Sequence, residues 1–336
     1  MIMTKNYISY LYIFFVLFLI QACDTRLHKG PNIDKSQLIN IDVKIHRYEI
    51  ALANADTSNF LEDITQIQQE FPLFLGTSKL TNEQLVPLYK YVTDTQLIAI
   101  SNSVSGMYTQ LDELELQLSS AFSRYHYFFP NKQIPRVYSY VSNLFFEEPI
   151  IFDDSVLIIA LDVYLGEGFS AYRSLGIPNY KIRCMTDNNI AIDVMKAIYI
   201  KELALRNKQK TLVDRMIAAG KLLYYLDAML PDVADSLKIC YTSEQIDWIE
   251  NNKSNVWAFL VENKMFYSAD YKTQTKLMQD GPFTTGFSNN SPSRIGIWLG
   301  WQIVRKYMDT NPDITLENLI QNTDAQAIFN QSGYKP

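Results

Sequence analysis

The residues best placed to do chemistry follow an apolar run, Val156 to Leu161, where the sequence turns polar and glycine-rich. Open sheets bind ligands at strand ends of this kind. Carboxylates beside a guanidinium could move protons there. A solvated turn is the alternative structure for the same pattern. The candidate functional cleft that we infer comprises Asp162, Tyr164, Glu167, Arg294 and Trp301.

The sequence carries no dedicated metal or cofactor motif. None of its three histidines, His28, His46 and His126, has a second histidine three or four residues away. The zinc motif H-E-x-x-H, the nucleophile elbow G-x-S-x-G, the P-loop and the dinucleotide motif G-x-G-x-x-G do not occur. The acidic pairs at 147–148 and 153–154 stand next to turns, where solvated side chains are expected. We therefore expect no catalytic set, no metal ligands and no cofactor.

The overall charge argues against a nucleic-acid partner. The chain of 336 residues has a formal net charge of −6, and its lysines and arginines form no cluster. Binding to a phosphate backbone requires a concentrated basic face. Nucleic acid is therefore excluded as a partner.

The first 22 residues are typical of a signal peptide rather than of a membrane-spanning helix. Ile8 to Ile20 is mostly apolar, but as a helix it would be only about 20 Å long, shorter than a hydrocarbon core of about 30 Å. The run Leu19-Ile20-Gln21-Ala22-Cys23 resembles a bacterial lipobox, which predicts lipidation of Cys23. An ordinary secretory signal is the alternative.

The polar residues that follow, 23–40, read as the lipidated N-terminus and a tether without periodicity. Acyl chains on Cys23 would hold the protein on a membrane. Since no acidic run follows Asp24, we expect a lipid-anchored position in the cell envelope that faces the periplasm.

Two cysteines remain after Cys23. Cys184 and Cys240 could pair in an oxidising compartment, or each could be isolated, with Cys240 buried between its apolar neighbours. Neither has a histidine nearby in the sequence, which disfavours a catalytic thiol.

The rest of the chain, 41–336, predicts a single α+β domain, mostly helical with a small β-sheet. The expected strands are 41–50, 134–141, 149–152 and 156–161. The expected helices are 57–71, 81–93, 109–128, 189–206, 211–230, 243–264, 271–279 and 316–329, besides a central helix at 291–308.

The central helix should organise the domain. Ser291 is a good N-cap, Pro292 suits the first helical position, and Asn311-Pro312 provides a stop. The helix is apolar on nearly every face, which predicts burial. Gly296 and Gly300 lie on one face and each costs about 1 kcal/mol in a helix, so a second backbone should pack against them. Arg294 is the charge expected to be carried inward with this helix.

Several segments together resemble the gliding-motility lipoprotein B (GldB) family of Bacteroidetes, from about Ile41 to the last residue. They are Phe71-Pro72, Tyr127-Phe128-Phe129-Pro130, Pro135-Arg136-Val137, Asp162 to Glu167, Leu230-Pro231-Asp232, Tyr241-Thr242 with Gln245 and Trp248, Ser291 to Gly296 with Gly300 to Arg305, Ile328-Phe329 and Tyr334-Lys335-Pro336. The stretch from Arg294 to Arg305 is the most specific. The resemblance implies a lipid-anchored protein associated with surface gliding and the envelope machinery, and it implies no known biochemical activity. Gly168 stands where the family suggests an acidic residue.

A fainter likeness points to zincin-type peptidases, in the order of a strand, two helices and a glycine-bearing final helix. The helix that would hold zinc, Asp193 to Leu203, has no histidine. Ala219-Gly220 stands where a further acidic ligand would be. If the kinship holds, the fold is a degenerate metallopeptidase scaffold, and the protein a pseudo-peptidase.

The leading hypothesis is thus a non-enzymatic, membrane-anchored lipoprotein that supports or binds envelope proteins of the gliding machinery. The first alternative is an atypical hydrolase on the peptidase-like scaffold, with Asp162 and Glu167 acting beside Arg294. The second is glycan capture, which would require exposed, coplanar tryptophans.

Overall fold

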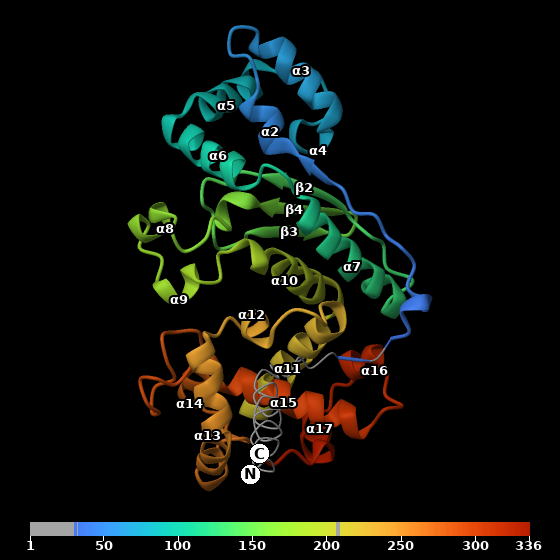
Figure 1. The fold of residues 1–336 in the computed structure, drawn as a ribbon, viewed down its shortest axis with the longest axis vertical. Helices are drawn as coiled ribbons and strands as arrows, with labels where there is room; N and C mark the ends of the chain where they lie inside the picture. The colour runs from blue at the N-terminus through green and yellow to red at the C-terminus, as the bar shows by residue number, and fades with distance from the viewer. Residues whose placement is uncertain (1–29, 32, 206–208) are drawn as a thin grey trace, which may run out of the picture.

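Figure 1 shows the computed structural model of the chain, which describes residues 30–31, 33–205 and 209–336. The expected signal peptide, 1–22, and the expected lipidation site, Cys23, lie outside the described residues. Among the helices that are described, none combines the length and the apolar character needed to cross a bilayer.

Four strands form one mixed sheet in the order β1–β2–β4–β3. β1 (Ile45–Arg47), β2 (Arg136–Tyr140) and β4 (Val156–Ala160) are parallel, and β3 (Ile150–Asp153) pairs antiparallel with β4 at the edge. β4 lies inside the sheet, as its run of apolar residues predicts. The small sheet and the many helices confirm the α+β class.

The opening strand is shorter than expected, so the range 41–50 is wrong at both ends. The amide of Ile41 donates to Ser123 Oγ at 3.2 Å, and the amide of Val43 donates to Ser119 Oγ at 3.0 Å. Serine hydroxyls of a helix therefore accept the hydrogen bonds of these two amides, so that residues 41 and 43 do not pair with a neighbouring strand. After Arg47 the chain turns directly into helix α2 (Tyr48–Ala53).

Helices from the N-terminal part of the chain cover one face of the sheet (Figure 1). They are α2, α3 (Phe60–Glu70), α4 (Pro72–Leu75), α5 (Asn82–Thr93) and α6 (Thr95–Met107). Their core is aromatic: Tyr48 stacks on Phe74 with ring centroids 4.1 Å apart, and Phe71 packs between this pair and Tyr138 of β2. α3 and α5 confirm the expected helices, while α6 was not expected.

Helices α7 (Asp112–Phe128) and α10 (Asp187–Ile198) lie across the sheet from this group (Figure 1). The short helices α8 (Ser170–Ser174) and α9 (Asn179–Ile182) connect β4 to α10. α10 continues into a π-helical turn, η4 (Tyr199–Leu203), and π-helical turns are frequent at functional sites.

The remaining helices form the larger C-terminal part. They are α11 (Leu212–Met229), α12 (Asp235–Ile239), α13 (Ser243–Glu262), α14 (Tyr271–Met278), α15 (Ile295–Thr310), α16 (Leu316–Gln321) and α17 (Ala325–Ser332). The single helix expected at 316–329 is in fact two, because Asp324 caps a new start by accepting from the amide of Ala327 at 2.8 Å.

Helices α11 and α15 pack backbone to backbone, which confirms the close approach predicted from the glycines of α15. An ideal Cβ on Gly300 would lie 1.9 Å from the carbonyl oxygen of Met216, and one on Gly220 would lie 2.3 Å from the carbonyl oxygen of Gly300. Gly296 meets α14 instead, with Met278 and Leu277 beside it. The glycines thus allow α15 to sit between two neighbours.

The start of α15 differs from the prediction. Helix geometry begins at Ile295, and Arg294 is the N-cap with a left-handed backbone, φ 57°. Ser291 Oγ is buried without a hydrogen-bond partner, so it does not cap the helix. The carbonyl of Pro292 accepts bonds from the amide and the hydroxyl of Thr284, so tertiary contacts hold this segment outside the helix.

Gly300→Ala is expected to lower the free energy of unfolding by about 1–3 kcal/mol, because the new methyl group would force α11 and α15 apart. Urea denaturation of the purified protein measures this change. Gly106→Ala is the matched control: its Cβ would meet nothing within 4 Å, and replacing a helical glycine should stabilise the protein by up to about 1 kcal/mol. Equal effects of the two substitutions would contradict close packing at Gly300.

The described part of the expected tether lies against the domain. A Cβ on Gly30 would lie 2.6 Å from the backbone carbonyl of Asp227, at the end of α11. Further on, Lys35–Gln37 form a short 3₁₀ helix, η2, and Tyr127 of α7 donates a hydrogen bond to Gln37 Oε1 at 3.1 Å. The chain therefore contacts the folded domain at Gly30 and again at Gln37.

Candidate functional site

Asp162 is buried, in contrast to the cleft position that the sequence predicted. Its carboxylate accepts hydrogen bonds from the amides of Ser142 and Leu144, at 2.8 and 2.6 Å, and from the Ser142 hydroxyl. Burial raises the pKa of Asp162, and these hydrogen bonds oppose the shift. With no exposed surface, the side chain fixes the loop after β2 and cannot line a cleft.

Tyr164 is also buried, so its predicted place in a cleft is corrected in the same way. Its hydroxyl donates to Asp193 Oδ2 of α10 at 3.1 Å, and its carbonyl accepts from the Tyr108 hydroxyl at 2.6 Å. Burial, and then the nearby charge of Asp193, raise the pKa of this phenol well above its ordinary value. Tyr164 therefore joins the strand-end loop to α10 and to the end of α6.

Glu167 and Arg294 do lie close together, since both lie near enough to Arg183 for their charges to affect its pKa. Burial lowers the pKa of Arg183, and the charge of Arg294 adds to this effect, while Asp280 and Glu167 oppose it. Arg294 lies 3.3 Å from Asp280 and donates to the carbonyl of Ile239 at 2.5 Å. Glu167 is exposed. These contacts do not include Asp162, so the predicted trio of Asp162, Glu167 and Arg294 is not assembled.

A disulfide holds this neighbourhood together. Cys184 and Cys240 are bonded, with Cα atoms 6.0 Å apart, which decides between the two alternatives that the sequence left open. Cys184 follows Arg183, and Cys240 precedes Tyr241, whose ring centroid lies 5.9 Å from the Arg294 guanidinium carbon. The bond is in keeping with an oxidising compartment.

Trp301 belongs to a buried charge network in the C-terminal part. Its indole N–H donates to Asp227 Oδ2 at 2.8 Å, and its ring lies 3.8 Å below the guanidinium carbon of Arg305. Asp227 also pairs with Lys238 at 2.9 Å and with two nitrogens of Arg305, each at 2.8 Å. Asp235 completes the network by pairing with Arg305 at 2.6 Å.

The four charges of this network sum to zero. Burial alone would lower the pKa of Arg305, but the hydrogen bonds and charges of Asp235 and Asp227 outweigh it and raise the pKa above its ordinary value. These buried ion pairs join α11, α12 and α15. The charge that α15 carries inward is therefore Arg305, not Arg294 as predicted.

The tryptophans do not form a glycan-binding platform. Trp298 and Trp301 are buried. Trp257 stacks on Phe329 with ring centroids 5.8 Å apart, and Trp248 packs edge-on against Phe287. None of the four is exposed, which argues against the glycan alternative.

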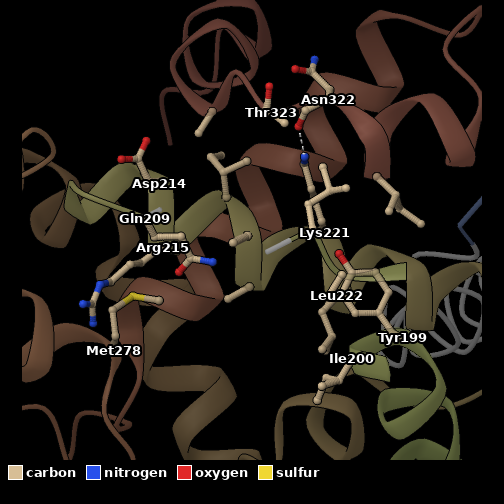
Figure 2. A pocket seen from close by; sticks show the side chains of 17 residues that line it. Tyr199, Ile200, Gln209, Asp214, Arg215, Lys221, Leu222, Met278, Asn322 and Thr323 are labelled. Atoms are coloured by element: carbon tan, nitrogen blue, oxygen red, sulfur yellow. Dashed lines mark hydrogen bonds between the residues drawn. The ribbon is translucent and has the colours of Figure 1, made fainter. Parts of the chain in front are cut away.

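A cavity of about 400 Å³ that the sequence prediction missed lies along α11, between η4 and the link from α16 to α17 (Figure 2). Lys221 of α11 is buried beside it and donates a hydrogen bond to the carbonyl of Asn322. Burial lowers the pKa of Lys221 to about 8. Lys221, the one charged residue of the otherwise uncharged run 216–226, was the sequence signal that could have revealed this site.

Across the described ranges 30–31, 33–205 and 209–336, no three His, Cys, Asp or Glu side chains are grouped so that they could hold a metal ion. The zincin likeness rests on β4, α10, α11 and α15, but α15 is not the final helix, since α16 and α17 follow it. No solved structure matches the chain, so the peptidase-like scaffold stays a prediction.

Comparison with known families bears on the whole molecule. No curated protein matches the chain either. The family model of the gliding motility protein GldB matches residues 28–336 and so spans the entire described fold. The chain therefore belongs to the GldB family, whose members are cell-envelope lipoproteins related to gliding motility.

Proposed function

We propose that this protein is anchored by lipid on Cys23, faces the periplasm, and acts without catalysis as a support for partner proteins of the gliding machinery. Membership of the GldB family supports the envelope role and the existence of partners. The partners of the buried carboxylates support a role without catalysis. The contact of the N-terminal segment with the domain supports the lipid anchor.

The observation that carries the proposal is the contact of Gly30 with the end of α11. Gly30 comes seven residues after Cys23. Seven extended residues span at most about 25 Å. A lipid on Cys23 would therefore hold the α11 end of the domain close to the membrane surface, which suits a fixed support better than a freely ranging enzyme.

Two buried carboxylates support a structural role: Asp162, which the sequence suggested for catalysis, and Asp227, which it did not suggest. Asp162 is occupied by backbone amides, and Asp227 is occupied by Lys238, Arg305 and Trp301. A general acid or base must reach the proton that it transfers. Buried side chains that are saturated in this way position loops and helices instead.

Cys23→Ser is expected to abolish incorporation of labelled palmitate and to release the protein from the membrane fraction, because the acyl chains provide the anchoring free energy. In a gliding cell whose own copy is deleted, the same variant should fail to restore motility. Labelling, membrane sedimentation and colony spreading measure the three effects. Thr25→Ala, two residues away, should behave as the unmodified protein does.

Glu167→Gln separates support from catalysis, because Glu167 is the exposed carboxylate of the strand-end loop. We expect it to restore motility fully. Loss of motility in a folded, membrane-bound Glu167→Gln protein would contradict the non-catalytic role, as would chelator-sensitive peptide hydrolysis by the purified protein. Palmitate labelling that persists in Cys23→Ser would contradict the anchor.

A further inference from the structure

The cavity beside α11 has the size and walls of a small-molecule site. Its volume of about 400 Å³ lies within the usual range of about 300–1,000 Å³ for ligand pockets. Apolar side chains make up much of the wall, among them Ile200, Leu205, Ile217, Leu222 and Ile320. The rest of the wall carries polar and charged side chains, which can orient a ligand within the cavity.

Lys221 is the one charged residue of the cavity wall that is buried, and no carboxylate in the described part of the chain compensates its charge. The residue is only 7% exposed, and its ammonium forms no ion pair with any carboxylate of the described residues. Lys238, which is 1% exposed, is paired with Asp227 at 2.9 Å. Since a buried cation without a counter-ion is costly, Lys221 is prepared for an anion from outside.

The other polar groups around the cavity leave this role to Lys221. Figure 2 shows the Lys221 amine directed at Asn322. Arg215 is a second cation on the wall, with its Nε buried without a hydrogen-bond partner among the described residues, but its guanidinium points away at the opposite end of the cavity. Asp214 is engaged at the start of α11, where it accepts from the amides of Lys210 and Thr211. η4 presents the phenol of Tyr199, and the link from α16 to α17 presents Asn322 and Thr323.

We propose that the cavity binds a small organic acid with an apolar body, whose carboxylate meets the Lys221 ammonium while the body lies along the apolar wall. At its own end of the cavity Lys221 supplies one positive charge, which suits one negative charge, while Arg215 lies at the opposite end. A phosphate ester would bring about two charges, and the second would be buried without a partner. This site goes beyond the supporting role of the protein and does not depend on it.

Calorimetry with the full-length lipoprotein in nanodiscs tests the proposal, with empty nanodiscs as the blank. Hexanoate should bind at least ten-fold more tightly than hexanol or hexyl phosphate. Lys221→Met should weaken hexanoate at least ten-fold, whereas Lys335→Met, which removes an exposed lysine, should leave it unchanged. Ala218→Leu, which fills the cavity but keeps the lysine, should also abolish binding.

The pH dependence provides a second readout. An anion stabilises the ammonium form, so binding raises the pKa of Lys221 above its value of about 8 in the empty site. Hexanoate affinity should therefore be constant near neutral pH and fall, by up to ten-fold per pH unit, above about pH 8. Unchanged affinity in Lys221→Met, or equal binding of hexanol, would overturn the proposal. Tighter binding of hexyl phosphate than of hexanoate would also overturn it.

Discussion

Replacing Asp227 with asparagine is expected to lower the free energy of unfolding by about 3–5 kcal/mol, the usual cost of removing one partner from a buried ion pair. Both oxygens of Asp227 accept from charged or indole donors, at 2.8 to 2.9 Å. An amide nitrogen in place of either oxygen would face a donor. Lys238 would then lose its ion pair, and Arg305 would keep only its pair with Asp235, which is partly exposed.

Guanidinium denaturation monitored by tryptophan fluorescence measures this loss, and Trp301 reports on the site itself. Asp153→Asn is the matched control. Asp153 also pairs with a lysine, Lys201, at 3.0 Å, but its side chain is 76% exposed. Exposed pairs are worth about 0–1 kcal/mol. Equal destabilisation by the two substitutions would show that the network around Asp227 contributes no more than a surface pair.

The second large effect is expected from opening the disulfide. Cys184 and Cys240 are 56 residues apart, and closing a loop of that length restricts the unfolded chain by about 4 kcal/mol in the chain-entropy account. Reduction should therefore lower the free energy of unfolding by about 2–4 kcal/mol. Urea denaturation with and without reductant measures the difference.

The double variant Cys184→Ser/Cys240→Ser should match the reduced protein and should no longer respond to reductant. A reductant effect that persists in the double variant would place its cause elsewhere. The loop closed by the bond contains α10, α11 and α12. Reduced protein should therefore lose protection from hydrogen exchange first where Arg183 and Tyr241 face each other, because the bond no longer fixes those two segments.

Local patterns predicted the parts of the fold that depend on local physics. The apolar run of β4 predicted an interior strand, and the glycines of α15 predicted a close backbone contact, since only a packing gain offsets their cost in a helix. The predicted N-cap Ser291 was wrong, because hydrogen bonds from Thr284 to the carbonyl of Pro292 hold this segment outside the helix, which begins at Ile295. Asp94 was the overlooked cap of α6.

The sites were harder to predict, because their residues are distant in sequence. Asp227 meets Trp301 and Arg305 across 74 and 78 residues. Asp162 was predicted to line a cleft, but no local pattern indicates that the amides of Ser142 and Leu144, 20 and 18 residues earlier, enclose it. Lys221 was not recognised from the sequence, because the carbonyl of Asn322 that it contacts comes 101 residues later.

The contact of Gly30 has a mechanical consequence. The turn of α11 that it touches also carries Asp227, and through that carboxylate it is joined to α12 and α15. A force applied to the chain ahead of Gly30 would act on three helices that are joined by buried ion pairs, rather than on a flexible loop. If the protein is anchored through Cys23 as proposed, a force on the anchor would pass to the whole bundle and would not unfold the point of attachment first.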